Sequence, residues 1–484
     1  MQTFASRVFS YSFHVCRRFR ENVVTSQHET NIKNKHRMKY LLTIVCAVLL
    51  LGSCKHDKSA NEGSDFQLPA VEDIAMYQVN PRVFAPQNSL RAVAARIDSI
   101  RDLGVNMMWV MPIYPIGIEK GKNSPYCISN YTDVAPEFGT VDDFKYLTGV
   151  CHEHGMGIIL DWVANHTAWD HPWVKEHPDW YTYDEEADTI ICPQPWNWED
   201  VADLNYDNRD MRRAMIDAMK FWITEVGIDG FRCDVADGVP ADFWKEAIDE
   251  LRQAAAPRQI VMLAEGKRVD NFTVGGFDMN YGWDFKDSIV HVFRDGQPAT
   301  DLIAADKAEY DSLPGGKVKL RFTTNHDHST EATPVVEFTN ERGSMAAYVA
   351  SIFLHGGALI YGSQEVGYPD PINFFHYVPV DWTANSKLYE EYKELIELYN
   401  EEPALRKGQL TTFPDKDVLM FEKSLGDERF LVMVNVRNQE VEVTVPEPWV
   451  GKQVDDEAPG GDLHGLGEKL FFPPYAYRIL EFDE

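Results

Sequence analysis

The chain has 484 residues, of which 44% are hydrophobic, and its 46 basic and 76 acidic side chains give a formal net charge of −30 at pH 7. This acidic surplus excludes charge-driven binding to nucleic acid or to an anionic lipid surface, because both depend on Lys and Arg. The composition fits an exported protein that handles a neutral substrate, and the length suggests one large domain with a smaller one.

The first organised feature in chain order is a short apolar segment. Lys39 follows Met38 and precedes an apolar run from Leu41 to Leu51, after which the sequence LGSC ends at Cys54. The run is shorter than the roughly 20 residues of a membrane span but suits a signal peptide. It resembles a bacterial lipoprotein signal, which implies lipidation at Cys54; an ordinary signal peptide with an incidental cysteine is the alternative. We expect export and lipid anchoring to a bacterial membrane, the outer one being favoured, with cell surface and periplasm both open.

The N-terminal part therefore divides into three predicted segments. Residues 1–37 precede the expected natural start at Met38, residues 38–53 are the signal peptide, and the polar residues 54–69 are a tether. The rest of the chain holds four cysteines without metal-ligand spacing. Whether they form disulfides is left open: Cys127, Cys151, Cys192 and Cys233.

From about residue 74, short apolar runs alternate with segments of helical periodicity. The apolar runs predict eight strands: Ile74–Val79, Val105–Met111, Gly157–Val163, Ile228–Val235, Ile260–Glu265, Phe277–Tyr281 (the weakest), Val318–Thr323 and Ala358–Tyr361. The helical segments include Ser89–Leu103, Val141–His154, Arg209–Val226, Ala241–Ala254, Asn340–His355 and Lys387–Asn400. Eight strand–helix units predict a parallel, closed (β/α)₈ barrel. An open doubly wound sheet is the alternative, but no glycine-rich phosphate loop follows an early strand.

Two regions depart from this alternation. Residues 167–203 form an insertion after the third predicted strand that is rich in Trp, Pro and acidic residues. After about residue 405 the helical pattern stops and short alternating segments predict antiparallel strands. We therefore expect a barrel domain over 70–404 and an all-β sandwich domain over 405–484.

Polar clusters end several of the predicted strands. In a (β/α)₈ barrel the carboxyl ends of the strands form the active-site floor, so side chains far apart in sequence converge there. The clusters are Asp161, Asn165 and His166 in IILDWVANH; Arg232, Asp234 and Asp237 in GFRCDVAD; Glu265 in IVMLAEG; and Asn325, His326 and Asp327 in LRFTTNHD.

Two of these acids have contrasting surroundings. Arg232 and Asp234 lie two residues apart on a strand and share a face, so we expect the guanidinium to keep Asp234 ionised and lower its pKa. Glu265 follows apolar residues and has no cation beside it in sequence, so partial burial is expected to raise its pKa. One ionised and one protonated carboxyl is what glycoside hydrolysis requires. A purely structural Arg–Asp ion pair is the alternative reading.

Five sequence stretches, in order, resemble those of the α-amylase family of glycoside hydrolases over residues 74–484. They are DWVANH, GFRCD, LAEG, FTTNHD and GGALIYGSQE. The resemblance implies that Asp234 is the nucleophile, Glu265 the general acid and base, and Asp327 the group that binds the hydroxyls of the distorted sugar. It further implies retention of the α configuration.

The resemblance also implies a set of substrate-binding residues. Tyr126 would stack on the sugar, and His166 and His326 would hydrogen-bond its hydroxyls; Arg232 and Trp283 are included in the set. Trp162, Trp169, Trp196, Trp198 and Trp283 are candidates for stacking on further sugars. A calcium site is implied at Asn165, Asp203 and the carbonyl of Gly238, although Asp237-Gly238 stands where the family has Lys-His. No organic cofactor is expected.

The substrate expected from the resemblance is starch or maltooligosaccharides, cleaved at α-1,4 bonds. Strict exo-glucosidases of the family often carry an aspartate at the position of Asn123, which favours an endo-acting α-amylase here. An oligosaccharide-trimming α-glucosidase, oligo-1,6-glucosidase or neopullulanase-like enzyme is the second reading. A transglycosylase stays open, and so does a non-catalytic glucan-binding lipoprotein, which the presence of all three acids disfavours. No glucan-uptake partner is identified by the sequence, and the only expected membrane contact is the lipid anchor.

Overall fold

Eight parallel strands form a closed barrel in the computed structural model, which describes residues 66–482. The predicted extension, the signal peptide, Cys54 and most of the tether therefore lie outside the described residues. The barrel strands are β1 (Ala75–Val79), β2 (Met107–Val110), β3 (Gly157–Val163), β8 (Gly230–Asp234), β9 (Val261–Ala264), β10 (Met279–Tyr281), β11 (Val318–Arg321) and β12 (Gly357–Tyr361). Because β1 pairs with both β2 and β12, the sheet has no edge, which confirms the barrel and excludes the open sheet.

The strands are apolar because they are buried on both faces. On β1, Met76 points into the barrel interior with Met107 and Trp109, whereas Ala75 and Tyr77 pack in the layer shared with the helices. Seven of the eight predicted apolar runs contain one of these strands, including the weakest, which holds β10. The eighth, Ala358–Tyr361, covers all of β12 except Gly357.

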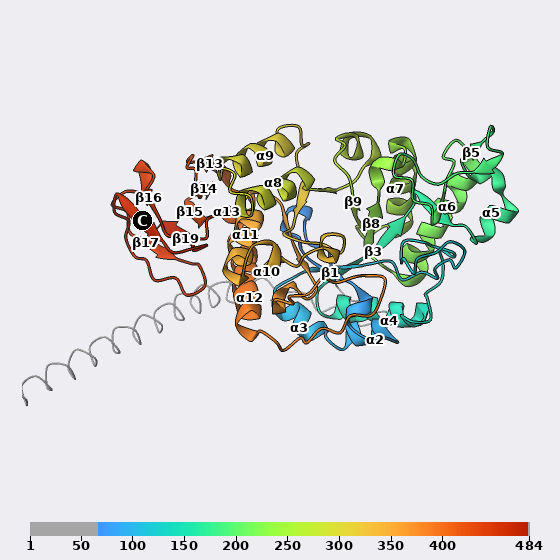
Figure 1. The fold of residues 1–484 in the computed structure, drawn as a ribbon, viewed down its shortest axis with the longest axis horizontal. Helices are drawn as coiled ribbons and strands as arrows, with labels where there is room; N and C mark the ends of the chain where they lie inside the picture. The colour runs from blue at the N-terminus through green and yellow to red at the C-terminus, as the bar shows by residue number, and fades with distance from the viewer. Residues whose placement is uncertain (1–65, 483–484) are drawn as a thin grey trace, which may run out of the picture. The chain divides into compact units, whose positions relative to one another are not determined.

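Helices surround the barrel (Figure 1). The longer ones are α4 (Val141–Glu153), α6 (Arg209–Phe221), α7 (Ala241–Ala255), α8 (Trp283–Phe293), α9 (Thr300–Tyr310), α11 (Glu341–Leu354) and α12 (Ser386–Glu401). The predicted helix Ser89–Leu103 is instead two short helices, α2 (Ser89–Ala94) and α3 (Ile97–Asp102), because the backbone of Arg96 (φ −106°, ψ 6°) departs from helical geometry. The Arg96 guanidinium lies 4.5 Å from the centre of the Trp382 ring. The short helices α10 (Pro334–Glu337) and α13 (Pro403–Lys407) complete this part.

The insertion after β3 is a small subdomain whose two ends are joined by strand pairing. β4 (His166–Ala168) pairs antiparallel with β7 (Val201–Asp203), which brings both ends of the insertion together beside the barrel. Between them lie α5 (Pro172–Glu176) and a hairpin of β5 (Tyr183–Asp184) and β6 (Thr189–Ile190).

The C-terminal part is antiparallel, as predicted, and has two sheets. The first contains β13 (Gln409–Thr412), β14 (Val418–Leu425), β15 (Glu428–Asn435), β19 (Tyr477–Phe482) and β17 (Val454–Asp456); the second pairs β16 (Val441–Thr444) with β18 (Lys469–Phe472). Buried Lys423 donates from Nζ to the carbonyl of Leu354 (3.0 Å), and Arg437 donates to the carbonyl of Val292 (2.8 Å), so this domain is fixed to the barrel helices.

Within residues 66–482 no helix is both long and apolar enough to cross a membrane. The four cysteines whose pairing the sequence leaves open are all unpaired in the structure, and three of them are buried.

Candidate active site

A cavity of about 720 Å³ opens at the carboxyl ends of the barrel strands. Asp234 is the last residue of β8, Glu265 directly follows β9, and Asp327 lies in the turn after β11, and all three line this cavity. The barrel topology thus brings together three acids although the first and the last, Asp234 and Asp327, are 93 residues apart in the sequence (327 − 234). Cavities of this size accommodate small organic ligands.

Arg232 lies beneath these acids and contacts three carboxyl groups at once. Its Nη1 atom is 2.9 Å from Oδ1 of Asp234 and 2.8 Å from Oδ1 of Asp161. Its Nη2 atom forms an ion pair at 2.8 Å with Oε2 of Glu265. Arg232 is fully buried and does not line the cavity, and its contact with substrate stays a prediction. In this structure its guanidinium contacts the acids and favours their ionised forms.

The electrostatics of the acids differ from the sequence expectation in one respect. Burial raises the pKa of Asp234 to about 7, although Arg232 opposes this, so the predicted lowering of its pKa is wrong. Burial raises the pKa of Glu265 further, to about 8, as expected, while Arg232 again lowers it. Burial is thus the largest cause of the raised pKa in both carboxyls, and both hold a proton to higher pH than free carboxyl groups do.

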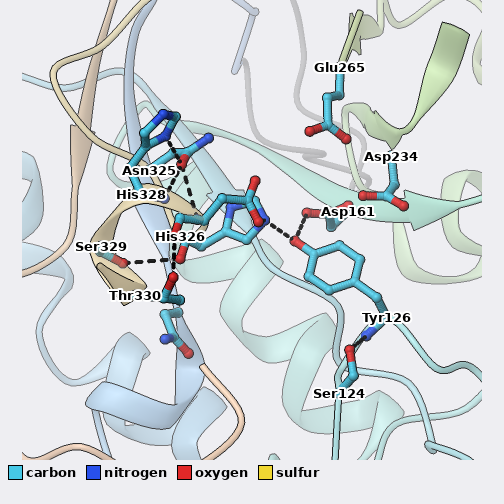
Figure 2. Close-up of polar contacts among 12 residues, drawn as sticks. Ser124, Tyr126, Asp161, Asp234, Glu265, Asn325, His326, His328, Ser329 and Thr330 are labelled. Atoms are coloured by element: carbon cyan, nitrogen blue, oxygen red, sulfur yellow. Dashed lines mark hydrogen bonds and ion pairs between the residues drawn. The ribbon is translucent and has the colours of Figure 1, made fainter. Parts of the chain in front are cut away.

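A chain of hydrogen bonds connects the cavity wall to this cluster (Figure 2). Gln78 donates from Nε2 to Nδ1 of His326 (2.8 Å), and burial lowers the pKa of His326 to about 4, so its ring is neutral at pH 7. Nε2 of His326 then donates to the hydroxyl of Tyr126 (2.6 Å), which donates to Oδ2 of Asp161 (3.1 Å). Because the Tyr126 ring also stacks on His326 at 5.3 Å, one rigid aromatic wall faces the acids.

The insertion supplies another part of the cavity lining. Trp196 and Trp198 stack in parallel with ring centres 5.0 Å apart, and the ring of His166 packs edge-on against Trp198. All three line the cavity, as does Trp283 at the start of α8. Burial lowers the pKa of His166 to about 4, so it acts as a neutral hydrogen-bonding group. Flat aromatic faces of this kind suit the apolar faces of sugar rings.

Two of the five tryptophan candidates do not reach the cavity. Trp162 is fully buried and packs against Tyr114, Tyr131 and Phe231, because it is on the helix-facing side of β3. Trp169 is half-buried within the insertion, where Lys120 covers its ring.

Several site residues were not identified from the sequence. Gln78 on β1 sets the tautomer of His326, and Trp109 on β2 donates from Nε1 to Oδ2 of Asp161 (3.1 Å). Phe374 and Phe375, in the loop before α12, complete the aromatic lining of the cavity. A polar Gln78 within an otherwise apolar strand was the one available signal, since a buried amide must have a partner.

The residues implied for calcium lie where the insertion meets the barrel. Oδ1 of Asn165 would be 2.6 Å from a Cβ atom placed on Gly238, so these two groups are neighbours. Asp203 is half-buried, and burial raises its pKa. Among residues 66–482 no three His, Cys, Asp or Glu side chains are grouped as metal ligands, so a cation here would depend on one carboxylate, one amide and carbonyl oxygens. Oxygen donors of this type fit Ca²⁺.

Comparison with known proteins then assigns the family. The model of the alpha amylase catalytic domain matches residues 78–384, well over half of the chain, and covers the strands that carry the three acids. The chain belongs to the alpha-amylase family. The model of the maltogenic amylase C-terminal domain matches residues 410–479.

The similar members of the alpha-amylase family are distant in sequence. Alpha-amylase MalA of Haloarcula japonica is 26% identical over 409 residues, which cover 79% of this chain and 58% of that protein. The oligo-1,6-glucosidase of Parageobacillus thermoglucosidasius is 25% identical over 410 residues, or 69% of this chain and 71% of that protein. Among solved structures, the noncanonic maltogenic alpha-amylase AmyB of Thermotoga neapolitana has a TM-score of 0.77 at 23% identity, with 86% of this chain and all of that chain covered, which supports the fold alone.

Proposed function

We propose that this protein hydrolyses α-1,4-glucosidic bonds in starch or maltooligosaccharides with retention of configuration. The single observation that carries the proposal is the contact of one guanidinium, that of Arg232, with both Asp234 and Glu265. A shared guanidinium favours the short separation of about 5–5.5 Å found between the two carboxyls of retaining enzymes. It thereby holds a nucleophile and a proton donor around one sugar ring.

The reaction proceeds in two displacements. Asp234 attacks the anomeric carbon and forms a glycosyl–enzyme ester, while Glu265 gives its proton to the departing glycosidic oxygen. Glu265, now ionised, takes a proton from water, which attacks the same carbon and releases Asp234 with the α configuration restored. Asp327, at the cavity surface, accepts hydrogen bonds from the hydroxyls of the sugar as it distorts toward the oxocarbenium-like transition state.

Cleavage within longer chains is the first reading of specificity. Asn123, which stands where strict exo-glucosidases often carry an aspartate, donates from Nδ2 to the carbonyl of Phe375, and its own carbonyl accepts from Nη1 of Arg82 (2.8 Å). This residue therefore fixes two loops to each other and is not free to hold a chain end. Trimming of short or α-1,6-linked oligosaccharides is the second reading, which the similarity to an oligo-1,6-glucosidase supports.

A product profile on amylose, maltotriose, panose and pullulan separates these readings. Rapid loss of amylose viscosity with mixed maltooligosaccharide products supports the endo-acting amylase. Release of glucose from panose without loss of amylose viscosity supports the trimming enzyme. Formation of products longer than the substrate identifies transglycosylation. No cleavage of any of them, with glucan binding retained, supports a binding lipoprotein and contradicts the proposal.

We also propose a structural Ca²⁺ at the base of the insertion, held by Asn165, Asp203 and the carbonyl of Gly238. Support comes from the contact between Asn165 and Gly238 and from the half-buried carboxylate of Asp203. The ion would supply positive charge that joins the insertion to the barrel, and it takes no part in bond cleavage.

Export and lipid anchoring through Cys54 is a further proposal, which rests on the sequence alone. Lys39, the apolar run and the LGSC ending support it. Incorporation of a labelled fatty acid into the parent protein but not into Cys54→Ala tests it, and protease access in whole cells distinguishes the cell surface from the periplasm.

A further inference from the structure

The residue after the proposed nucleophile has an unusual backbone. Val235 adopts φ +43° and ψ +45°, in the left-handed region. A β-branched side chain is strained there, because its Cβ substituents crowd the backbone. Such outliers persist where the surrounding structure fixes them, and they cluster at functional sites.

The left-handed turn directs two successive backbone amides at Glu265. The N–H of Val235 donates to Oε2 of the Glu265 carboxyl at 2.8 Å. The N–H of Ala236 donates to the backbone carbonyl of Glu265 at 3.0 Å. The side chain and the main chain of the proton donor are therefore both held by the turn that follows the nucleophile strand.

The two oxygens of the Glu265 carboxyl are consequently not equivalent. Oε2 faces the Val235 amide and, at 2.8 Å, the Nη2 atom of Arg232. A proton on Oε2 would oppose both of these positive groups, so Oε2 acts as the acceptor. The proton of the acid form must then be on Oε1.

Contacts in the next loop hold the strained turn in place. Oδ2 of Asp237 accepts from the N–H of Lys267 (2.8 Å), and Oδ1 accepts from Nδ2 of Asn271 (2.8 Å). Gly266 leaves room for this, since a Cβ atom there would lie 2.1 Å from Oδ1 of Asp237. The turn after β8 and the loop after β9 thus lock together around Glu265.

We propose that Val235 is a positioning residue whose left-handed backbone fixes Oε2 of Glu265 as the hydrogen-bond acceptor, so that Oε1 carries the proton to the leaving oxygen. This inference rests on the proposed hydrolase function. The amide also stabilises the ionised form of Glu265, so losing it raises the pKa of that group. The other charged or titratable groups that face Glu265 stay in place: Arg232, Asp161, Asp234, Tyr281 and Asp327.

The test compares two variants that lose the isopropyl group. Val235→Pro removes the backbone N–H and cannot adopt a positive φ, whereas Val235→Asn keeps the N–H in a residue that tolerates the left-handed region. We expect the basic limb of the kcat/KM profile on maltoheptaose to move up by about one pH unit in Val235→Pro, with kcat reduced about tenfold and KM little changed. In Val235→Asn the limb stays at the parent position. Any other pattern overturns the inference, and equal shifts in both variants assign the effect to the side chain.

A second measurement uses the parent protein and so does not depend on how the variants fold. With ¹⁵N-valine labelling, the amide resonance of Val235 should titrate with the basic limb, and this titration should vanish in Glu265→Gln. A Val235 amide that does not titrate in a parent enzyme that hydrolyses maltoheptaose overturns the inference alone. A parent enzyme that hydrolyses no α-glucan contradicts the proposed function instead.

Discussion

Asp161 and Arg232 form an ion pair of 2.8 Å in which neither side chain has any solvent exposure. The two residues are register partners on neighbouring strands β3 and β8. The second oxygen of Asp161 accepts hydrogen bonds from Trp109 and Tyr126, so this carboxylate joins the guanidinium under the acids to the aromatic wall of the cavity. Removing its charge should therefore affect both stability and catalysis.

Asp161→Asn should lower the free energy of unfolding by about 3 kcal/mol, because it breaks a fully buried ion pair while leaving the other charge in place. Urea denaturation at pH 7 measures this. Asp98→Asn is the matched control, since Asp98 is 91% exposed and its pairing with His154 is at the surface. Equal losses of unfolding free energy in the two variants would show that the buried ion pair stabilises the fold no more than the surface pair does.

Substrates with different leaving groups distinguish the roles of Asp234 and Glu265. Asp234→Asn should lose at least about 10⁴-fold in kcat on both maltoheptaose and α-maltosyl fluoride, because the nucleophile is needed for both. Glu265→Gln should lose about 10³-fold on maltoheptaose but far less in the first step with the fluoride, which departs without a proton. Pre-steady-state fluoride release measures this, and an equal loss of Glu265→Gln on both substrates contradicts the assignment.

The pH–rate profile should be bell-shaped with its maximum between about pH 7 and pH 8. Below this range Asp234, with its pKa of about 7, takes up a proton and no longer attacks; above it Glu265, with its pKa of about 8, loses the proton that it donates. The kcat/KM of the parent on maltoheptaose across pH 5–10 checks both limbs. A basic limb that survives unchanged in a Glu265→Gln variant would assign it to another group.

The same two carboxyls predict how stability depends on pH. Their pKa values in the folded protein lie above those of the unfolded chain, so the folded state binds more protons between about pH 4 and pH 8. The contribution of these groups to the free energy of unfolding is therefore highest below about pH 4. It decreases as the pH rises from about 4 to about 8. Glu265→Gln should raise Tm at pH 8.5 relative to the parent and change it little at pH 4.5. No gain at pH 8.5 would contradict the raised pKa.

The exposed tryptophan of the insertion should contribute to the binding of long substrates. Trp196 is 44% exposed and lines the cavity, stacked on Trp198. Trp196→Ala should raise KM about fivefold for maltoheptaose and less for maltotriose, through the loss of a stacking surface. Tyr183→Ala is the control, because Tyr183 is similarly exposed (48%) on the same insertion but does not line the cavity. Comparable effects of both changes on KM would argue against a specific platform.

Calcium removal tests the proposed ion site. A chelator should lower Tm of the parent protein by several degrees, because a ligand that binds only the folded state stabilises it by mass action. In Asp203→Asn the chelator should have little effect. An unchanged Tm in the parent, with no bound calcium by elemental analysis, would contradict the proposal.

The barrel could be predicted from the sequence because a strand that is buried on both faces appears as a largely apolar run, such as Gly157–Val163. The acids were identifiable because polar clusters directly follow such runs. The break at Arg96 was not, since residues 89–103 contain no glycine or proline that would mark it and their apolar spacing continues through it.

The electrostatics of the site were only partly predictable. Adjacency in sequence indicated the contact between Arg232 and Asp234, but the contact of the same guanidinium with Glu265 depends on the pairing of β8 with β9. The pKa of Asp234 was mispredicted because burial, which outweighs the guanidinium, cannot be judged from one strand. The left-handed turn at Val235 could not be predicted either, because valine normally avoids the left-handed region and its presence in a sequence does not indicate such a turn.

The anomeric configuration of the first product tests the central claim most directly. ¹H NMR of maltoheptaose during the first minutes of hydrolysis, before mutarotation, reports which anomer is released. Asp234 and Glu265, held on one guanidinium, predict that the α anomer appears first and the β anomer grows in later. Initial release of the β anomer would mean direct attack by water and would contradict the double displacement.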